Sequence, residues 1–174
     1  MELKDVNLVE DGYVAVIDKP LEWTSADVVR KVKFRLQRMG YRKIKVGHAG
    51  TLDPIATGVL IVLLGKATRA SDYLMAEQKE YVAKLVLGKT TDTQDITGNV
   101  LTESEVNVTK EEFVEAMNSF IGDIEQIPPM FSAIKKDGKK LYELAREGIT
   151  IDREKRKVTI FDIKICEIDM ENYA

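Results

Sequence analysis

The sequence predicts an α+β fold in which a mixed, largely antiparallel sheet is flanked by helices. Helix-type and strand-type hydrophobic periods are interspersed along the chain, and the connections between them are short. Asp137-Gly138 is a tight-turn signal of the kind that joins antiparallel strands. The 174 residues fall within the usual size of a single domain and contain no internal repeat or linker, so we expect one domain over residues 1–174.

The N-terminal part predicts a strand, a helix, a loop and a second strand, in that order. Gly12–Ile17 is a β-prone run, and Pro20 stops it because proline cannot continue a central ladder. An amphipathic helix follows, capped by Thr24-Ser25 and ended by Gly40. After a glycine-rich loop, the run Val59–Leu64 has the length and β-branched content of a buried strand.

The later part of the chain predicts two further strands and two helices. Lys79–Leu87 and Val158–Ile168 alternate their apolar residues as strands do. Thr109 and Glu112 have the spacing of a capping box at the start of a helix. Leu141–Glu147 predicts a shorter helix that ends at a glycine.

The composition indicates a soluble, cytoplasmic protein without a membrane segment. Charged residues make up 32% of the chain and hydrophobic residues 44%, and no apolar stretch approaches the roughly 18 to 20 residues that cross a bilayer. The amino terminus has neither the basic cluster nor the apolar segment of a secretory signal. A single cysteine, Cys166, excludes an internal disulfide framework, which fits a reducing compartment.

The charge distribution leaves the nature of the partner open. A formal net charge of −3 and a pI near 5.4 argue by themselves against a polyanionic partner. Positive charge nevertheless gathers in the C-terminal third, in the run Arg153–Lys157 and in a cluster formed by Lys135, Lys136, Lys139 and Lys140. These side chains either face phosphates or form solvated surfaces.

The loop from Lys45 to Gly58 is the candidate functional segment. It contains three glycines, the only histidine, His48, and an Asp53-Pro54 pair. Asp53 is either a turn residue, as Asp before Pro commonly is, or a catalytic carboxylate that acts as a nucleophile or proton acceptor. His48 supplies a flat ring close by or makes a hydrogen bond within the loop.

The residue inventory excludes several familiar sites. One histidine and one cysteine cannot form an ordinary zinc site, and no spacing of carboxylates matches a calcium loop, so we expect no metal. The glycines around Lys66 lack the spacing of a phosphate loop. A nucleophile pair of Cys166 and His48 is conceivable, but the strand pattern around Cys166 predicts a buried structural cysteine.

Several motifs, in the same order, resemble the TruB family of tRNA pseudouridine synthases. They cover nearly the whole chain and comprise Asp18-Lys19-Pro20 with Thr24-Ser25, Gly47–Pro54 with Ala56–Leu60, Gly65–Arg69, Lys79-Glu80-Tyr81, Thr91-Asp92-Thr93 through Gly98, Gln126–Ala133 and Gly138–Tyr142. That family isomerises the uridine at position 55 in the TΨC arm. The resemblance implies a pseudouridine synthase-like fold, tRNA as partner and no cofactor, and we expect a monomer.

The same resemblance assigns roles to single residues. Asp53 is the catalytic aspartate, Tyr81 stacks on the target uracil, and His48 lies beside the displaced nucleotides. Arg69 pairs with Asp53 and keeps it ionised, or makes only a surface ion pair. Lys19 belongs to the substrate site or serves only to end a strand.

The segment 128–148 resembles the RNA-gripping thumb of the family, which gives the four clustered lysines an RNA-binding role. The family continues into a Gly-Thr-Tyr-Ile-Arg type motif and often a small RNA-binding domain, so we expect a catalytic domain that is incomplete at its C-terminus. Two alternatives remain: a non-catalytic RNA-binding or folding module with the same fold, and a pseudouridine synthase that depends on guide RNA.

Overall fold

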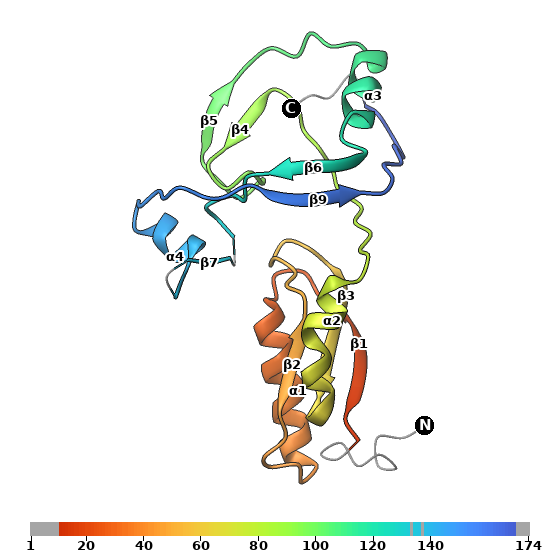
Figure 1. Cartoon of the computed structure of the whole chain (residues 1–174), viewed down its shortest axis with the longest axis vertical. Helices are drawn as coiled ribbons and strands as arrows, with labels where there is room; N and C mark the ends of the chain where they lie inside the picture. The colour runs from red at the N-terminus through yellow and green to blue at the C-terminus, as the bar shows by residue number, and fades with distance from the viewer. Residues whose placement is uncertain (1–10, 133, 137, 170–174) are drawn as a thin grey trace. The chain divides into compact units, whose positions relative to one another are not determined.

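The computed structural model describes residues 11–132, 134–136 and 138–169 (Figure 1). The chain forms two compact units, the first ending at Tyr81 and the second beginning at Val82. The expectation of one domain over residues 1–174, with a thumb-like insertion at 128–148, stays a prediction.

The first unit is built on a three-stranded antiparallel sheet in the order β1-β3-β2. Its strands are β1 (Tyr13–Lys19), β2 (Val46–Ala49) and β3 (Gly58–Leu64). Lys19 lies opposite Gly58, so β1 ends where β3 begins. The connection from β2 to β3 is the glycine-rich loop, and it therefore leaves the sheet at this same end.

Helix α1 (Ser25–Arg38) packs against this sheet (Figure 1). Thr24 and Asp27 form a capping box at its start, as the Thr24-Ser25 cap predicted. The core cluster joins buried side chains of the helix, the following segment and β3, namely Val28, Leu36, Ile44, Leu60, Val62 and Leu64. Burying one such side chain stabilises the fold by about 1.5–3 kcal/mol, so these contacts hold the first unit together. β3 leads into η2 (Gly65–Ala70) and α2 (Ser71–Ala76).

The described part of the second unit contains three antiparallel strand pairs and two helices. The pairs are β4 (Lys89–Thr91) with β5 (Val100–Glu103), β6 (Gly122–Gln126) with β9 (Arg156–Ile160), and β7 (Lys135–Lys136) with β8 (Lys139–Lys140). The helices are α3 (Lys110–Asn118), which begins with the predicted Thr109–Glu112 capping box, and α4 (Leu141–Arg146). Asp137, of the predicted turn between β7 and β8, lies outside the described residues.

The structure confirms the predicted α+β class, because helices flank sheets in which every described pairing is antiparallel. The predicted strands at residues 12–17 and 59–64 and the helix from Thr24 to Gly40 are also confirmed. Within residues 11–132, 134–136 and 138–169, no helix combines the length and apolar character needed to cross a bilayer.

Two strand predictions were wrong in extent or existence. Residues 79–87 alternate as predicted but form no strand, and Val82 is 93% exposed because no neighbouring strand pairs with it. The predicted strand Val158–Ile168 extends only to Ile160. That residue pairs with Gly122, the first residue of the partner strand β6, so no partner is left for the residues that follow. Cys166 therefore lies outside any strand, and it is exposed rather than buried as predicted.

Candidate active site

The loop that carries Asp53 links two neighbouring strands of the first unit. It begins at Gly50 and ends at Gly58, whose backbone φ angles of 95° and 114° lie in the left-handed region that favours glycine. The Ala56 N–H donates to the Asp53 carbonyl at 3.0 Å, so Asp53 opens a tight turn within the loop. The turn interpretation of Asp53 is thus correct for its backbone and leaves its side chain free for another role.

Hydrogen bonds to the backbone on both sides of Asp53 hold the loop in place. The Glu22 N–H donates to the Pro54 carbonyl at 2.8 Å. The Ser25 hydroxyl accepts from the Leu52 N–H at 3.0 Å and donates to the Leu52 carbonyl at 3.2 Å. Ser25 is only 2% exposed, so water competes little for these bonds. Glu22 and Ser25 therefore act together as a clamp on the loop.

Lys19 supports this clamp from inside the unit. Its side chain is fully buried, and its ammonium donates to the carbonyls of Pro20 at 3.0 Å and Trp23 at 2.6 Å. No carboxylate of the described residues lies within 4 Å of it. A buried cation needs hydrogen-bond acceptors, and the carbonyls of Pro20 and Trp23 provide them. These two bonds fix the turn that presents Glu22 to the loop. Of the two roles predicted for Lys19, the geometry supports the structural one.

The sequence predicts an irregular loop at His48, but the structure places this residue in β2. Its Nδ1 is hydrogen-bonded to the Gly50 carbonyl, and its own carbonyl accepts from the Ser71 hydroxyl at 3.4 Å. Because a carbonyl can only accept, Nδ1 carries a proton, and Nε2 is the nitrogen left to face a ligand. The half-buried ring is thus oriented by the first residue of the loop.

The carboxylate of Asp53 is exposed, and no described residue donates a hydrogen bond to it or pairs with it. Arg69, the last but one residue of η2, is also exposed, and no ion pair joins it to Asp53 in the part of the chain that the structure describes. The predicted pair is therefore absent here. Tyr81 lies outside any strand, and 67% of its surface is exposed.

The four clustered lysines lie on one hairpin of the second unit. Lys135 pairs with Lys140 and Lys136 with Lys139 across β7 and β8. The Lys136 ammonium donates to the Asp152 carbonyl at 2.6 Å, and that of Lys140 lies 5.2 Å from the centroid of the Tyr142 ring. Lys139 is exposed, and the side chain of Lys135 lies outside the description.

Sequence reasoning missed Ser25 as a support of the site, because its contacts join residues 27 positions apart. A structural role for Lys19 was one of the two interpretations, but its hydrogen bonds to the Pro20 and Trp23 carbonyls could not be predicted from the sequence. The only available signal was the closeness of Lys19, Thr24 and Ser25 in one short segment. No three His, Cys, Asp or Glu side chains gather into a metal-binding group within the described ranges.

A family model described as "TruB family pseudouridylate synthase (N terminal domain)" matches residues 37–174. The chain belongs to the TruB family. This confirms the resemblance drawn from the loop and the motifs around it.

Curated relatives within the TruB family carry the name tRNA pseudouridine synthase B. The protein of Clostridium kluyveri is 50% identical over 154 residues, which are 88% of this chain and 52% of that protein. The protein of Phocaeicola vulgatus is 45% identical over 163 residues, which are 92% of this chain and 69% of that protein. The chain spans about half the length of most of these relatives.

A solved structure titled "Crystal Structure of a Cbf5-Nop10-Gar1 Complex" is also similar. It matches with a TM-score of 0.53 and 29% identity, over 90% of this chain and 36% of that chain. The similarity agrees with the α+β class, and the TruB family assignment rests on the sequence matches.

Proposed function

We propose that this chain is the catalytic part of a tRNA pseudouridine synthase that isomerises the uridine at position 55 in the TΨC arm. The observation that carries the proposal is the exposed carboxylate of Asp53, which pairs with no described residue and whose neighbours Leu52 and Pro54 are clamped, in a TruB family chain. Relatives that are 45% and 53% identical and named tRNA pseudouridine synthase B support tRNA as the substrate.

The chemistry requires one carboxylate and no co-substrate. The N1–C1′ bond breaks, the uracil turns, and a C5–C1′ bond forms, while C5 loses a proton and N1 gains one. Atoms and electrons balance, so the isomerisation needs neither an oxidant nor a reductant. Asp53 has two free oxygens with which to act on C6 of the base or at C1′ of the ribose, and both roles fit a nucleophile.

The other residues of the proposed site receive the base and the RNA backbone. Removing a base from its stack costs a few kcal/mol, and stacking on an aromatic ring returns about 1–3 kcal/mol. The exposed ring of Tyr81 suits this role. His48 offers Nε2 to the displaced nucleotides, and Arg69, Lys139 and the other hairpin lysines supply cations for phosphates.

We place this activity in the cytoplasm with tRNA as the partner of a monomer. The lone cysteine, Cys166, cannot form a disulfide within the chain, which suits a reducing compartment. The proposed chemistry uses groups of one chain only, so it needs no second copy.

The test compares Asp53→Asn with Asp72→Asn. Asp72 is also an exposed aspartate of the first unit, and it lies in α2. Tritium release from a TΨC hairpin labelled at C5 of uridine should be abolished in Asp53→Asn, because a neutral amide cannot replace the carboxylate as nucleophile. Asp72→Asn should match the unchanged protein, and filter binding of the hairpin should be the same for all three.

Retained turnover in Asp53→Asn would refute the catalytic assignment. Binding of the hairpin by the unchanged protein without any tritium release would instead favour the non-catalytic RNA-binding module.

A further inference from the structure

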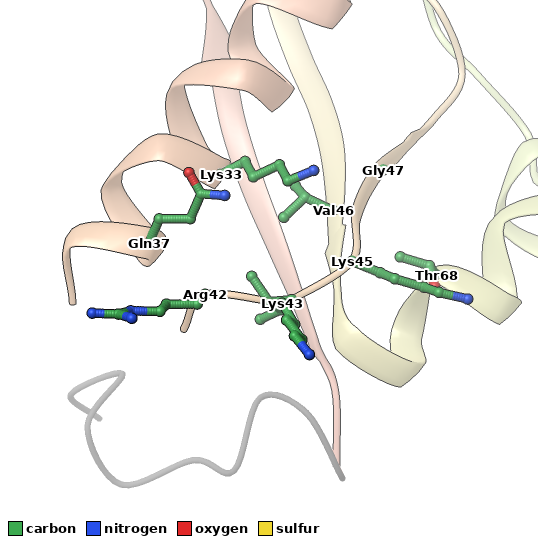
Figure 2. A pocket seen from close by; sticks show the side chains of 9 residues that line it. Lys33, Gln37, Arg42, Lys43, Lys45, Val46, Gly47 and Thr68 are labelled. Carbon is green, nitrogen blue, oxygen red and sulfur yellow. The ribbon is translucent and has the colours of Figure 1, made fainter. Parts of the chain in front are cut away.

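A basic groove, distinct from the catalytic loop, opens beside the N-terminal end of β2. It has a volume of about 460 Å³ and is lined by the polar side chains of Lys33, Gln37, Arg42, Lys43, Lys45 and Thr68. Figure 2 shows that Lys33 and Gln37 come from α1, that Arg42, Lys43 and Lys45 come from the segment before β2, and that Thr68 comes from η2. Three separate elements of the first unit thus build one concave surface.

The basic groove lies in a part of the chain with a strong excess of positive charge. Residues 25–49 contain eight Lys or Arg and a single acidic residue, Asp27, although the whole chain has a net charge of −3. Asp27 is already engaged with Thr24 and Arg30. Among the described residues, no carboxylate pairs with Lys33, Arg42, Lys43 or Lys45. The uncompensated cations repel one another, and an anion in the groove would relieve this repulsion.

Buried contacts fix the backbone that carries these cations. Ile44 is only 3% exposed and belongs to the core cluster, so it anchors the chain between Lys43 and Lys45. The Lys45 carbonyl accepts from the Gly65 N–H at 2.9 Å, which joins the groove segment to η2. Lys33 and Gln37 are four residues apart on α1 and therefore lie on one face of the helix. The groove is a formed surface and not a set of free side chains.

The groove and the catalytic loop lie at opposite ends of β2. Lys45 precedes the strand, whereas the loop follows its last residue, Ala49. The three steps from Val46 to Ala49, at about 3.3 Å each, separate the two ends of the strand by roughly 10 Å. A ligand in the groove therefore cannot be the uracil that Asp53 attacks, but one RNA molecule can reach both places.

We propose that the basic groove binds phosphodiester groups of the RNA backbone, apart from the nucleotide held at Asp53. It supplies affinity and not chemistry, since it contains lysine, arginine, amide and hydroxyl groups and no acid or base poised for the isomerisation. The contact is independent of base sequence, because phosphates carry no sequence information. This inference rests on the proposed function in taking tRNA as the RNA.

The test compares a variant that lacks two groove cations with a control variant that lacks two cations elsewhere on the first unit. The groove variant is Lys43→Gln with Lys45→Gln, and the control is Lys31→Gln with Arg35→Gln, which removes the same charge from exposed positions of α1 that do not line the groove. Filter binding of an unmodified tRNA transcript is measured between 50 and 200 mM NaCl. Each phosphate contact is expected to contribute about 0.9 to the slope of log K against log salt.

Because it lacks two phosphate contacts, the groove variant should have a slope of log K against log salt that is smaller by about 1.8. Between 50 and 200 mM NaCl, its affinity should therefore fall by about tenfold less than that of the unchanged protein. Its KM for tRNA should rise while kcat at saturating tRNA stays the same. The control should show at most a small, parallel loss. Equal salt slopes for the groove and control variants would overturn the proposal.

Two further measurements show which proposal has failed if the expected result is not obtained. Calorimetry with inorganic phosphate tests a small-anion site, and phosphate binding that the groove variant loses without any change in its RNA salt slope would also overturn the proposal. Binding is measured in the Asp53→Asn background as well, where it does not depend on turnover. The proposed function can therefore fail in the tritium assay while the groove is supported in the binding assay, and the reverse also holds.

Discussion

Removing the Ser25 hydroxyl should impair catalysis by displacing the loop rather than by touching the substrate. In Ser25→Ala, the Leu52 N–H and carbonyl lose the partner that lies at 3.0 and 3.2 Å. An unsatisfied buried polar group costs about 1–3 kcal/mol, and because Leu52 is only half-buried we expect a loss of about 1–2 kcal/mol in the free energy of unfolding. Asp53 is the next residue, and a shift of about 1 Å at a reacting group can reduce turnover by about 10²-fold.

The matched control for this prediction is Thr24→Ala. It removes the N-cap hydroxyl of α1, which donates to and accepts from Asp27, but leaves both Leu52 bonds intact. Losing an N-cap costs about 0.5–2 kcal/mol, so the two variants should have similar stability in urea unfolding. Tritium release, assayed well below both unfolding transitions, should fall only in Ser25→Ala. Equal turnover in the two variants would refute the clamp as the device that positions Asp53.

Two other predictions concern the loop and the helix caps. Gly58→Ala should destabilise the protein by about 1–3 kcal/mol in urea unfolding, because φ is 114° there and the strain comes from the backbone, with no atom within 4 Å of the added Cβ. Gly47→Ala is its control, since φ is not positive there and the nearest atom, Cγ2 of Thr68, is 3.8 Å from the added Cβ; an equal loss in both would contradict the strain argument. The side-chain and backbone hydrogen bonds from Thr24 hold the pKa of Asp27 in the folded protein below its ordinary value of 3.8. The ionised Asp27 carboxylate therefore stabilises the fold above pH 3.8, and this stabilisation is lost as the pH falls through the lower pKa of the folded state. The stability difference between the unchanged protein and Asp27→Asn should therefore shrink in acid unfolding below about pH 4, and a difference that grew there would show the opposite sign of linkage.

The sequence was informative wherever the structure depends on near neighbours along the chain. The Thr109–Glu112 capping box and the Thr24 cap need only residues three positions apart, so both were predictable and both formed. The strand β3 was predictable because its apolar run must be buried whichever elements cover it. The segment 79–87 shows the limit of this reasoning, since alternation describes one strand and says nothing about whether a partner lies beside it.

The sequence by itself determined the family, the candidate loop and Asp53, because these depend on residue identity in a fixed order. Tertiary structure decided what holds and surrounds that loop. The Ser25 contacts with Leu52 span 27 positions, and the basic groove unites Lys33, Lys45 and Thr68 from three separate elements. Such contacts form only when α1 packs on β3, and that packing is driven by apolar burial that carries no information about which polar groups it brings together. The aspartate that we propose as catalytic could therefore be named from the sequence, whereas its clamp and the groove had to be read from the fold.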